Sequence, residues 1–337
     1  MGDQDRIPAL RRAYDEMLKL SGLDLPFSEF RPKSYPNPYA SGAFDPKAAG
    51  VVQHMLEAER HYVDWPSVAT EPRPIFLARL ANIKKTSRGF PGARLPYAQR
   101  VLTNEMEEVR SWLAKQGAKL PCEIFAGLYP TGTLMARIAP VPGEGALVLV
   151  NVGLMDLIFS ILKINIATPA PGEPQRLLSE ERATLALVEV FNAYLYGEGS
   201  LGAWPLPRLP EERERPLDFV LRRCEQFVLC HEIGHLALGH VSIDDPELSE
   251  KIGDYEPKQE SEADHFAVST MICAHKDDPL WELRSPFLAG AILTFFAIAI
   301  VVGSLHETLG LVETGNESHP KLTARMNATA EHLIPNR

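Results

Sequence analysis

The residues best suited to chemistry lie in the segment HEIGH at residues 231–235. His231 and His235 are four positions apart, so on a helix both imidazoles project from the same face, one turn from each other. That spacing suits two nitrogen ligands of one zinc ion. Glu232 follows the first histidine, where its carboxylate can take a proton from a water molecule that zinc has made more acidic. The pattern predicts metal-assisted hydrolysis with Glu232 as the general base.

The surrounding sequence indicates that this segment lies on a helix. The stretch DFVLRRCEQFVLCHEIGHLALGH predicts one helix over about 217–238, and Gly239 is the residue type that usually follows a helix end. A chance match falls in a loop as readily as on an apolar helix, so the context favours a functional motif over a core helix that carries the pattern by accident. His240 follows the predicted helix end, and we expect it to be a surface or capping side chain.

A zinc site that catalyses hydrolysis needs a third protein ligand and an open fourth position. Metzincins have a histidine six residues after the second ligand, but that position is Val241 here. The later segment KQESEADHFAVSTMICA offers Glu260 and Asp264, four apart on one predicted helical face. We expect Glu260 to bind the metal and Asp264 to hold the outer N–H of one histidine. Glu262 is the competing ligand on another face, and a solvated acidic helix face is the alternative for these acids.

The elements before these helices must build the framework of the site. Apolar residues at three- and four-residue spacing predict an amphipathic helix over 96–119. Three β-rich stretches between residues 122 and 152 predict a small antiparallel sheet. Further helices are expected over 153–163 and 182–196. The predicted fold class is therefore α+β, a mostly helical zincin-like metallopeptidase domain with a small antiparallel sheet.

Composition and charge narrow the class of protein. Hydrophobic residues make up 45% of the chain and charged residues 23%, as in ordinary globular domains. Lys and Arg number 34 against 44 Asp and Glu, and no basic run offers a face for phosphate backbones, so nucleic acid is not expected as a partner. The four cysteines lack the close pairing of a zinc ribbon, and the polar N-terminus lacks the layout of a signal peptide. We expect a cytoplasmic protein.

Three segments resemble, in order, the motifs of the gluzincin family that contains the HtpX and CAAX-prenyl-protease metallopeptidases. HEIGH at 231–235 is similar to the family's HExxH, ESEAD at 260–264 to its ExxAD, and SHPKLTARM at 318–326 to its SHPxxxxR. The resemblance implies one zinc ion per chain, bound by the two histidines and Glu260, and a protein or peptide substrate. In outline the chain also looks like the phage-exclusion peptidase Lit.

The resemblance also implies roles for residues outside the ligand set. His319 would stabilise the oxyanion of the tetrahedral intermediate, and Arg325 would support the site near the ligand helix. The stretch ALVLVNVGLMDLI looks like the family's substrate-side edge strand followed by a Gly-Leu helix, which implies that a peptide docks by strand addition. The predicted edge strand comprises Leu147, Val148, Leu149, Val150, Asn151 and Val152.

The remaining predictions concern three larger segments of the chain. The first 95 residues are rich in proline and aromatic residues and predict an irregular N-terminal layer on a peptidase domain over 96–337. A Gly/Pro-rich linker and the long distance to HEIGH predict an insertion at about 165–216. The uncharged stretch 287–305 reaches the minimum length of a membrane-spanning helix. Small and polar residues dilute it, and it lies between two predicted site residues, so a buried core helix is favoured over a membrane segment.

The predicted function is the hydrolysis of peptide bonds in a protein substrate by a zinc-dependent endopeptidase. A second hypothesis is a catalytically silent zinc-binding regulatory protein whose cleft the insertion blocks, although every catalytic residue type is present. A third is a membrane-embedded peptidase anchored in the inner membrane through 287–305. Membrane association is thus the alternative to a cytoplasmic location.

Overall fold

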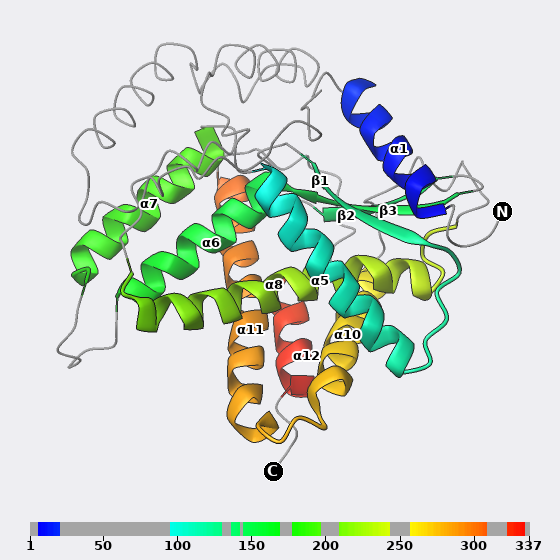
Figure 1. Ribbon diagram of the computed structural model, residues 1–337. Helices are drawn as coiled ribbons and strands as arrows, with labels where there is room; N and C mark the ends of the chain where they lie inside the picture. Colours follow the sequence, from blue (N-terminus) through cyan, green and yellow to red (C-terminus); the bar gives the residue numbers. More distant parts are fainter. Residues whose placement is uncertain are drawn as a thin grey trace.

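A computed structural model of the chain describes residues 6–20, 95–129, 136–141, 144–168, 177–196, 209–242, 257–308 and 322–333. Within these ranges the protein is mostly helical with one small sheet, which confirms the predicted α+β class. Helix α1 (Arg6–Leu20) lies on one side of the sheet, whereas helix α5 (Leu95–Lys115) lies on the other side (Figure 1). Apart from α1 and residue 95, the predicted N-terminal layer falls outside the described residues.

The sheet consists of β1 (Ile124–Tyr129), β2 (Ala136–Val141) and β3 (Gly145–Asn151), in the order β1-β3-β2. Strand β3 is antiparallel to β2 but parallel to β1. The sheet is therefore mixed, and the prediction of an antiparallel sheet is wrong. Successive strands do alternate in direction along the chain, but β3 lies between the first two, so its pairing with β1 must be parallel.

The side chains of β3 alternate between two packed faces. Leu147 and Leu149 pack against Leu10 of α1 and its neighbour Tyr14. Residues at even positions of β3, such as Val148, face the main helical core instead. Every residue of β3 is buried, which explains why this strand reads as a continuous apolar run.

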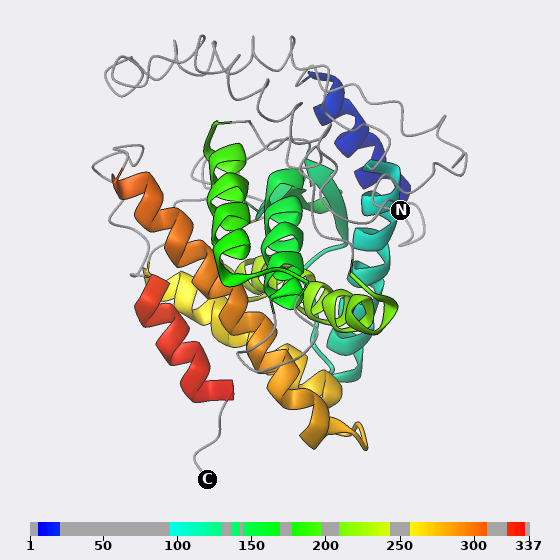
Figure 2. The same ribbon diagram turned by 90° about the vertical axis from the view of Figure 1, so that its left-hand side faces the viewer.

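The helices predicted from residue 96 up to and including the HEIGH segment are present, with shifted ends. They are α5, α6 (Val152–Ala167), α7 (Glu180–Tyr196) and α8 (Glu211–Ala237). Helix α8 begins at Glu211 rather than at residue 217, with Pro216 inside it. Acidic side chains in its first turn favour this earlier start, because they face the positive end of the helix dipole. Helix α7, which belongs to the predicted insertion, packs beside α6 (Figure 2).

Helix α8 is the centre of the helical layer. It packs against α5, α6, α10 (Pro257–His275) and α11 (Trp281–Thr308), and it also contacts β2. Helix α12 (Leu322–Leu333) lies next to α11 and α10 (Figure 2). Segments that are far apart in sequence therefore meet around the second half of α8.

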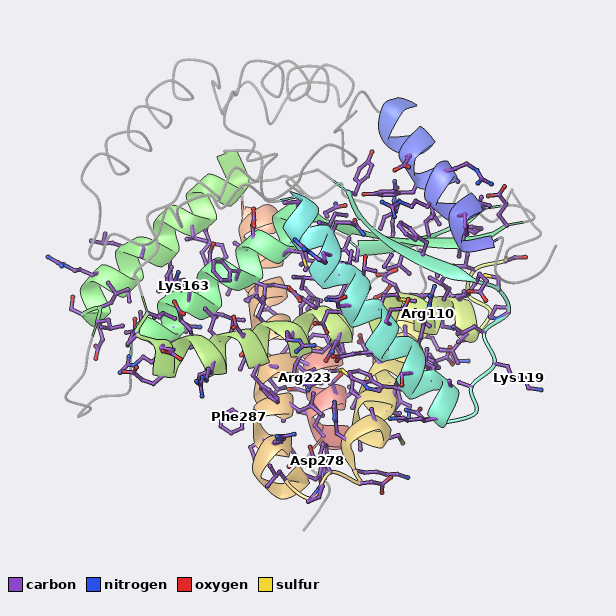
Figure 3. The ribbon with its side chains drawn as sticks, in the orientation of Figure 1. Arg110, Lys119, Lys163, Arg223, Asp278 and Phe287 are labelled. Atoms are coloured by element: carbon purple, nitrogen blue, oxygen red, sulfur yellow. The ribbon has the colours of Figure 1, made fainter. Side chains whose placement is uncertain are left out.

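Helix α11 contains the stretch predicted to be either a core helix or a membrane segment. By length and composition alone, Arg284–Val302 could cross a membrane, and 33% of it is buried inside the protein. Its inner face carries the fully buried Ile292 and Phe296, which belong to the main core. Phe287 lies at the outer side of the helix, 50% exposed, with its ring beside Phe219 of α8 (Figure 3). One face of α11 is thus part of the core and another is open.

Candidate metal centre

Helices α8 and α10 approach each other closely at the HEIGH segment because Gly234 has no side chain. A Cβ atom at this position would lie 3.1 Å from Cδ1 of Phe266 and 3.3 Å from Cα of Ala263. A larger side chain would therefore push α10 away from α8. The close approach brings Glu260, one turn before Ala263 on α10, next to the histidines of α8. This glycine thus has a packing role inside a helix, where glycine is otherwise unfavourable.

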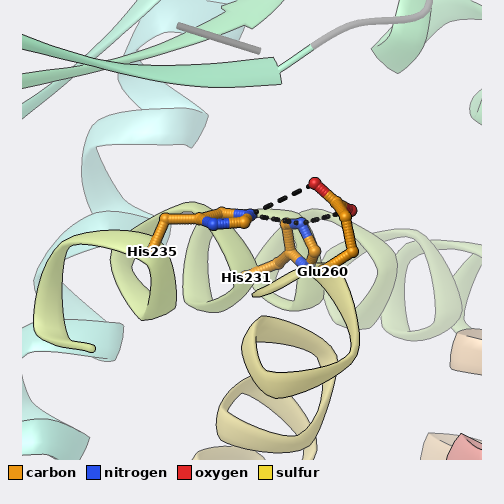
Figure 4. A group of neighbouring side chains, drawn as sticks. All are labelled: His231, His235 and Glu260. Atoms are coloured by element: carbon orange, nitrogen blue, oxygen red, sulfur yellow. Dashed lines mark hydrogen bonds and ion pairs between the residues drawn. The ribbon is translucent and has the colours of Figure 1, made fainter. Parts of the chain in front are cut away.

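Three side chains converge where the two helices meet (Figure 4). The Nε2 atoms of His231 and His235 are 3.2 Å apart. The carboxylate of Glu260 faces both nitrogen atoms, with its Oε2 atom 3.5 Å from Nε2 of His231 and its Oε1 atom 3.5 Å from Nε2 of His235. All three side chains are almost entirely shielded from solvent. Among the described residues, they form the one group of His, Cys, Asp or Glu side chains arranged to hold a metal ion.

The separations between these ligand atoms fit a tetrahedral metal site. Zinc with ligands at about 2.0–2.1 Å in tetrahedral geometry requires about 3.3–3.4 Å between neighbouring ligand atoms. The distances here are 3.2 Å between the two nitrogens and 3.5 Å from each nitrogen to the carboxylate. Two imidazoles and one carboxylate are also a donor set of catalytic zinc sites, which leave a fourth position open.

Ionisation of the three groups favours a bound cation. Burial lowers the pKa of His235 to about 4, so this imidazole is neutral at pH 7, as a metal ligand must be. Burial would raise the pKa of Glu260, but hydrogen bonds from His231 and His235 hold it far below its usual range. Burial would lower the pKa of His231, but hydrogen bonds to Asp264 and Glu260 raise it to about 10. A cation or a proton is therefore favoured between His231 and Glu260.

Asp264 supports the first histidine from the side opposite the metal position. Its Oδ1 lies 2.9 Å from Nδ1 of His231. Burial would raise the pKa of Asp264, but hydrogen bonds from Arg325 and His231 lower it, so the carboxylate is ionised. A carboxylate at this distance favours a proton on Nδ1 of His231, which leaves the Nε2 lone pair directed at the metal position.

Arg325 of α12 connects the two acidic side chains of α10. Its Nη1 lies 2.8 Å from Glu260, while its Nε and Nη2 donate hydrogen bonds to the two oxygens of Asp264 at 2.7 and 2.8 Å. The guanidinium is 8% exposed, so these charges interact in a region that excludes most water. The structure thus brings the predicted supporting residues Asp264 and Arg325 together with the three predicted ligands.

Glu232 lies beside the ligand group and is buried. Burial raises its pKa to about 7, and the backbone N–H of Ile138 in β2 donates a hydrogen bond to the carboxylate. Its Oε2 atom has no hydrogen-bond partner within the described part of the chain. A carboxyl group with a pKa near 7 can both accept and return a proton at neutral pH. The free oxygen is available to a water molecule or a substrate group.

An apolar cavity of about 130 Å³ opens beside His231 and Glu232. Its walls come from the second half of α8 and from three elements around it, β2, α6 and α11. The remaining lining residues are Ala136, Leu154, Phe227, Val228, Phe295, Ile298 and Ala299. The cavity therefore offers an apolar side chain a place next to the metal position.

The structure also shows a residue that sequence reasoning placed wrongly. The side chain of His240 is 6% exposed rather than at the surface, and its Nδ1 lies 3.1 Å from Nδ1 of His235. Glu262, the competing choice of ligand, contacts His240 Nε2 at 3.1 Å and is not part of the ligand group. The signal for His240 in the sequence is its position directly after Gly239, whose left-handed backbone turns the chain at the end of α8.

The prediction that residues 147–152 form an edge strand for the substrate is wrong, and the reason is the order of the strands in the sheet. Residues 147–151 belong to β3, which is paired along both sides with β1 and β2, and Val152 is the first residue of α6. A strand with two neighbours has no free backbone edge for a peptide. Within the described ranges, strand β2 is an edge strand of this sheet, and it contacts α8. His319, the predicted oxyanion-stabilising residue, lies outside the described residues.

A comparison with protein families gives a match that includes the ligand residues. Residues 212–336 match the family described as Peptidase U49. The matched region begins in the first turn of α8, and it contains the three ligand residues, Glu232 and Arg325. The match supports a peptidase. Comparison with curated proteins and with solved structures gave no match.

Proposed function

We propose that the chain is a zinc-dependent endopeptidase of the gluzincin type. The observation that carries this proposal is the convergence of His231, His235 and Glu260 at the separations that tetrahedral zinc requires. The family match over the same residues supports peptide hydrolysis rather than another use of a metal.

The roles of the side chains follow from their positions. Bound Zn²⁺ would supply a Lewis acid that polarises the scissile carbonyl and makes water a better nucleophile. Glu232 would take a proton from the attacking water and deliver it to the leaving amine, because its pKa of about 7 suits both transfers. Asp264 and Arg325 would hold the ligands in place. His319 would stabilise the developing oxyanion, as the resemblance to the HtpX family implies.

We further propose that the substrate peptide lies along β2. The N–H of Ile138 points away from β3, since it donates to Glu232, and the backbone of Ala136, two residues earlier, faces the same way. A peptide that pairs with this edge would pass between β2 and the metal position and would take over the Ile138 N–H from Glu232, which would leave this carboxylate to the attacking water. Ala136 also lines the apolar cavity, so an apolar side chain beside the scissile bond would enter it.

Metal content and turnover test the proposal together. Wild-type protein should contain about one zinc ion per chain by elemental analysis, and Glu260→Ala should lose most of it. Glu232→Gln should keep its zinc but cleave no peptide from a broad library. Glu211→Ala, on the exposed first turn of α8, is the matched control and should behave like the wild type in both assays.

Three results would overturn different parts of the proposal. Wild-type protein that stays metal-free after zinc is offered would refute the metal site. Zinc-loaded protein that leaves the entire library intact would refute the enzymatic function and favour the silent regulatory protein instead. Turnover that persists in Glu232→Gln would refute the role of this residue as the base.

A further inference from the structure

Helix α8 ends in a Schellman motif that folds the chain back against a metal ligand. Gly239 has a φ of +74°, the left-handed conformation that favours glycine. Its N–H donates to the carbonyl of Leu236, and the N–H of His240 donates to the carbonyl of His235. These are the two hydrogen bonds that define the motif. In this motif the residue after the glycine commonly contacts the residue five positions before it.

Here the two residues that the motif brings into contact are both histidines. The Nε2 atom of His235 faces His231 and Glu260, so this nitrogen belongs to the metal position. Its other ring nitrogen, Nδ1, meets Nδ1 of His240 at 3.1 Å. The second nitrogen of His240 then meets a carboxylate oxygen of Glu262 on α10, also at 3.1 Å. The side chains of His235 and His240 are 0% and 6% exposed.

Metal binding allows only one arrangement of the protons on the ring nitrogens of His235 and His240. The Nε2 atom of His235 must be unprotonated to bind a metal, so the neutral ring carries its proton on Nδ1. That N–H donates to Nδ1 of His240, which must then be an acceptor. His240 carries its own proton on Nε2 and donates it to the carboxylate of Glu262. Each ring nitrogen in this series thus has a role, and the hydrogen bonds run in one consistent direction.

We propose that His240 and Glu262 are positioning residues that fix the tautomer and orientation of His235 and so strengthen metal binding. This inference rests on the proposed function, since His235 matters here as a metal ligand. The pair would do for His235 what Asp264 and Arg325 do for His231. The two histidines would thus have separate supports, one from α12 and α10 and one from the end of α8 and α10.

Two variants of His240 separate a hydrogen-bonding role from simple packing. His240→Leu fills the space but accepts no hydrogen bond, whereas the side-chain oxygen of His240→Asn lies near the position of Nδ1 and can accept the proton of His235. Loss of a side chain that holds a metal ligand by a hydrogen bond typically weakens metal affinity about 10- to 100-fold. We expect a weakening of this size in His240→Leu and most of the wild-type affinity in His240→Asn. Leu238→Ala, at an exposed position of the same helix end, is the control and should change nothing.

The measurements are zinc affinity, by competition with a chromophoric chelator, and the visible spectrum of the Co²⁺-loaded protein, which reports ligand geometry. His240→Leu should also shift the Co²⁺ bands, and His240→Asn should restore them. The contacts from His235 through His240 to Glu262 form a relay, and Glu262→Ala tests its outer end. This side chain is 43% exposed, and its loss should weaken zinc binding by a smaller factor.

The possible outcomes distinguish this inference from the proposed function. Wild-type protein that binds neither Zn²⁺ nor Co²⁺ would refute the metal site and the relay together. Wild-type protein that binds zinc, with His240→Leu and Glu262→Ala equal to it in affinity and spectrum, would refute the relay alone. His240→Asn as weak as His240→Leu would also overturn the relay, because the contact would then be one of packing.

Discussion

The clearest test of how the acidic side chains are held is the replacement of Arg325 by methionine. The side chain is 8% exposed and makes three close contacts, one with Glu260 and two with Asp264, at 2.7–2.8 Å. Methionine has a similar length and adapts to the space, so the change removes mainly the charge and the hydrogen-bond donors. Two buried carboxylates then keep only His231 as a cationic partner.

The magnitude follows from the burial of this group. Removing one partner of a buried ion pair typically costs about 3–5 kcal/mol, because the remaining charge is not solvated. We expect Arg325→Met to lower the free energy of unfolding by about this amount at pH 7 in the presence of a chelator. Saturating zinc should reduce the loss, because a cation bound to Glu260 replaces part of the missing positive charge. Urea denaturation followed by circular dichroism measures both values.

The pH dependence has a defined sign. The pKa values of Glu260 and Asp264 are lowered in the folded protein, so these acids contribute stability above their unfolded pKa of about 4. This contribution is lost as the pH falls towards their folded pKa values. The difference in stability between the wild type and Arg325→Met should therefore shrink below about pH 4.

The matched control is Arg284→Met. Arg284 contacts Asp278 at 2.6 Å, but its side chain is 50% exposed, and exposed ion pairs contribute about 0–1 kcal/mol. The same substitution should therefore have little effect there. A loss of less than about 1 kcal/mol in Arg325→Met, equal to that of the control, would refute the view that this guanidinium stabilises the site through buried charge.

Three further predictions concern other parts of the structure. Gly234→Val should separate α8 from α10 and reduce the zinc content of purified protein; unchanged zinc content would contradict the role of close helix packing. Burial raises the pKa of Glu225 to about 8, so the stability of the wild type relative to Glu225→Gln should fall by on the order of 4 kcal/mol from pH 5 to pH 8 in urea titrations. A pH-independent difference would show that this carboxyl is not buried as described. Ala299→Phe should fill the apolar cavity and lower kcat/KM for peptides with a large apolar residue next to the scissile bond, with less effect on peptides carrying glycine there.

Local periodicity by itself determined which side chains share a helical face. The four-residue spacing places His231 with His235, and Glu260 with Asp264, whatever the rest of the chain does. Apolar patterns likewise located most helices and all three strands to within a few residues, because each element is amphipathic or continuously buried. Helix α8 begins earlier than the predicted residue 217, because Pro216 is tolerated inside the helix.

Contacts between distant segments were decided only by the tertiary structure. Strand β3 lies in the middle of the sheet because it inserts between β1 and β2, and no local pattern distinguishes a central strand from a buried edge strand. His240 contacts His235 because Gly239 reverses the chain at the helix end. The predicted helix stops at this glycine, so helical periodicity gives no position for the residue that follows it. Arg325 reaches two acids on another helix for the same general reason: periodicity describes one element, whereas packing determines which elements meet.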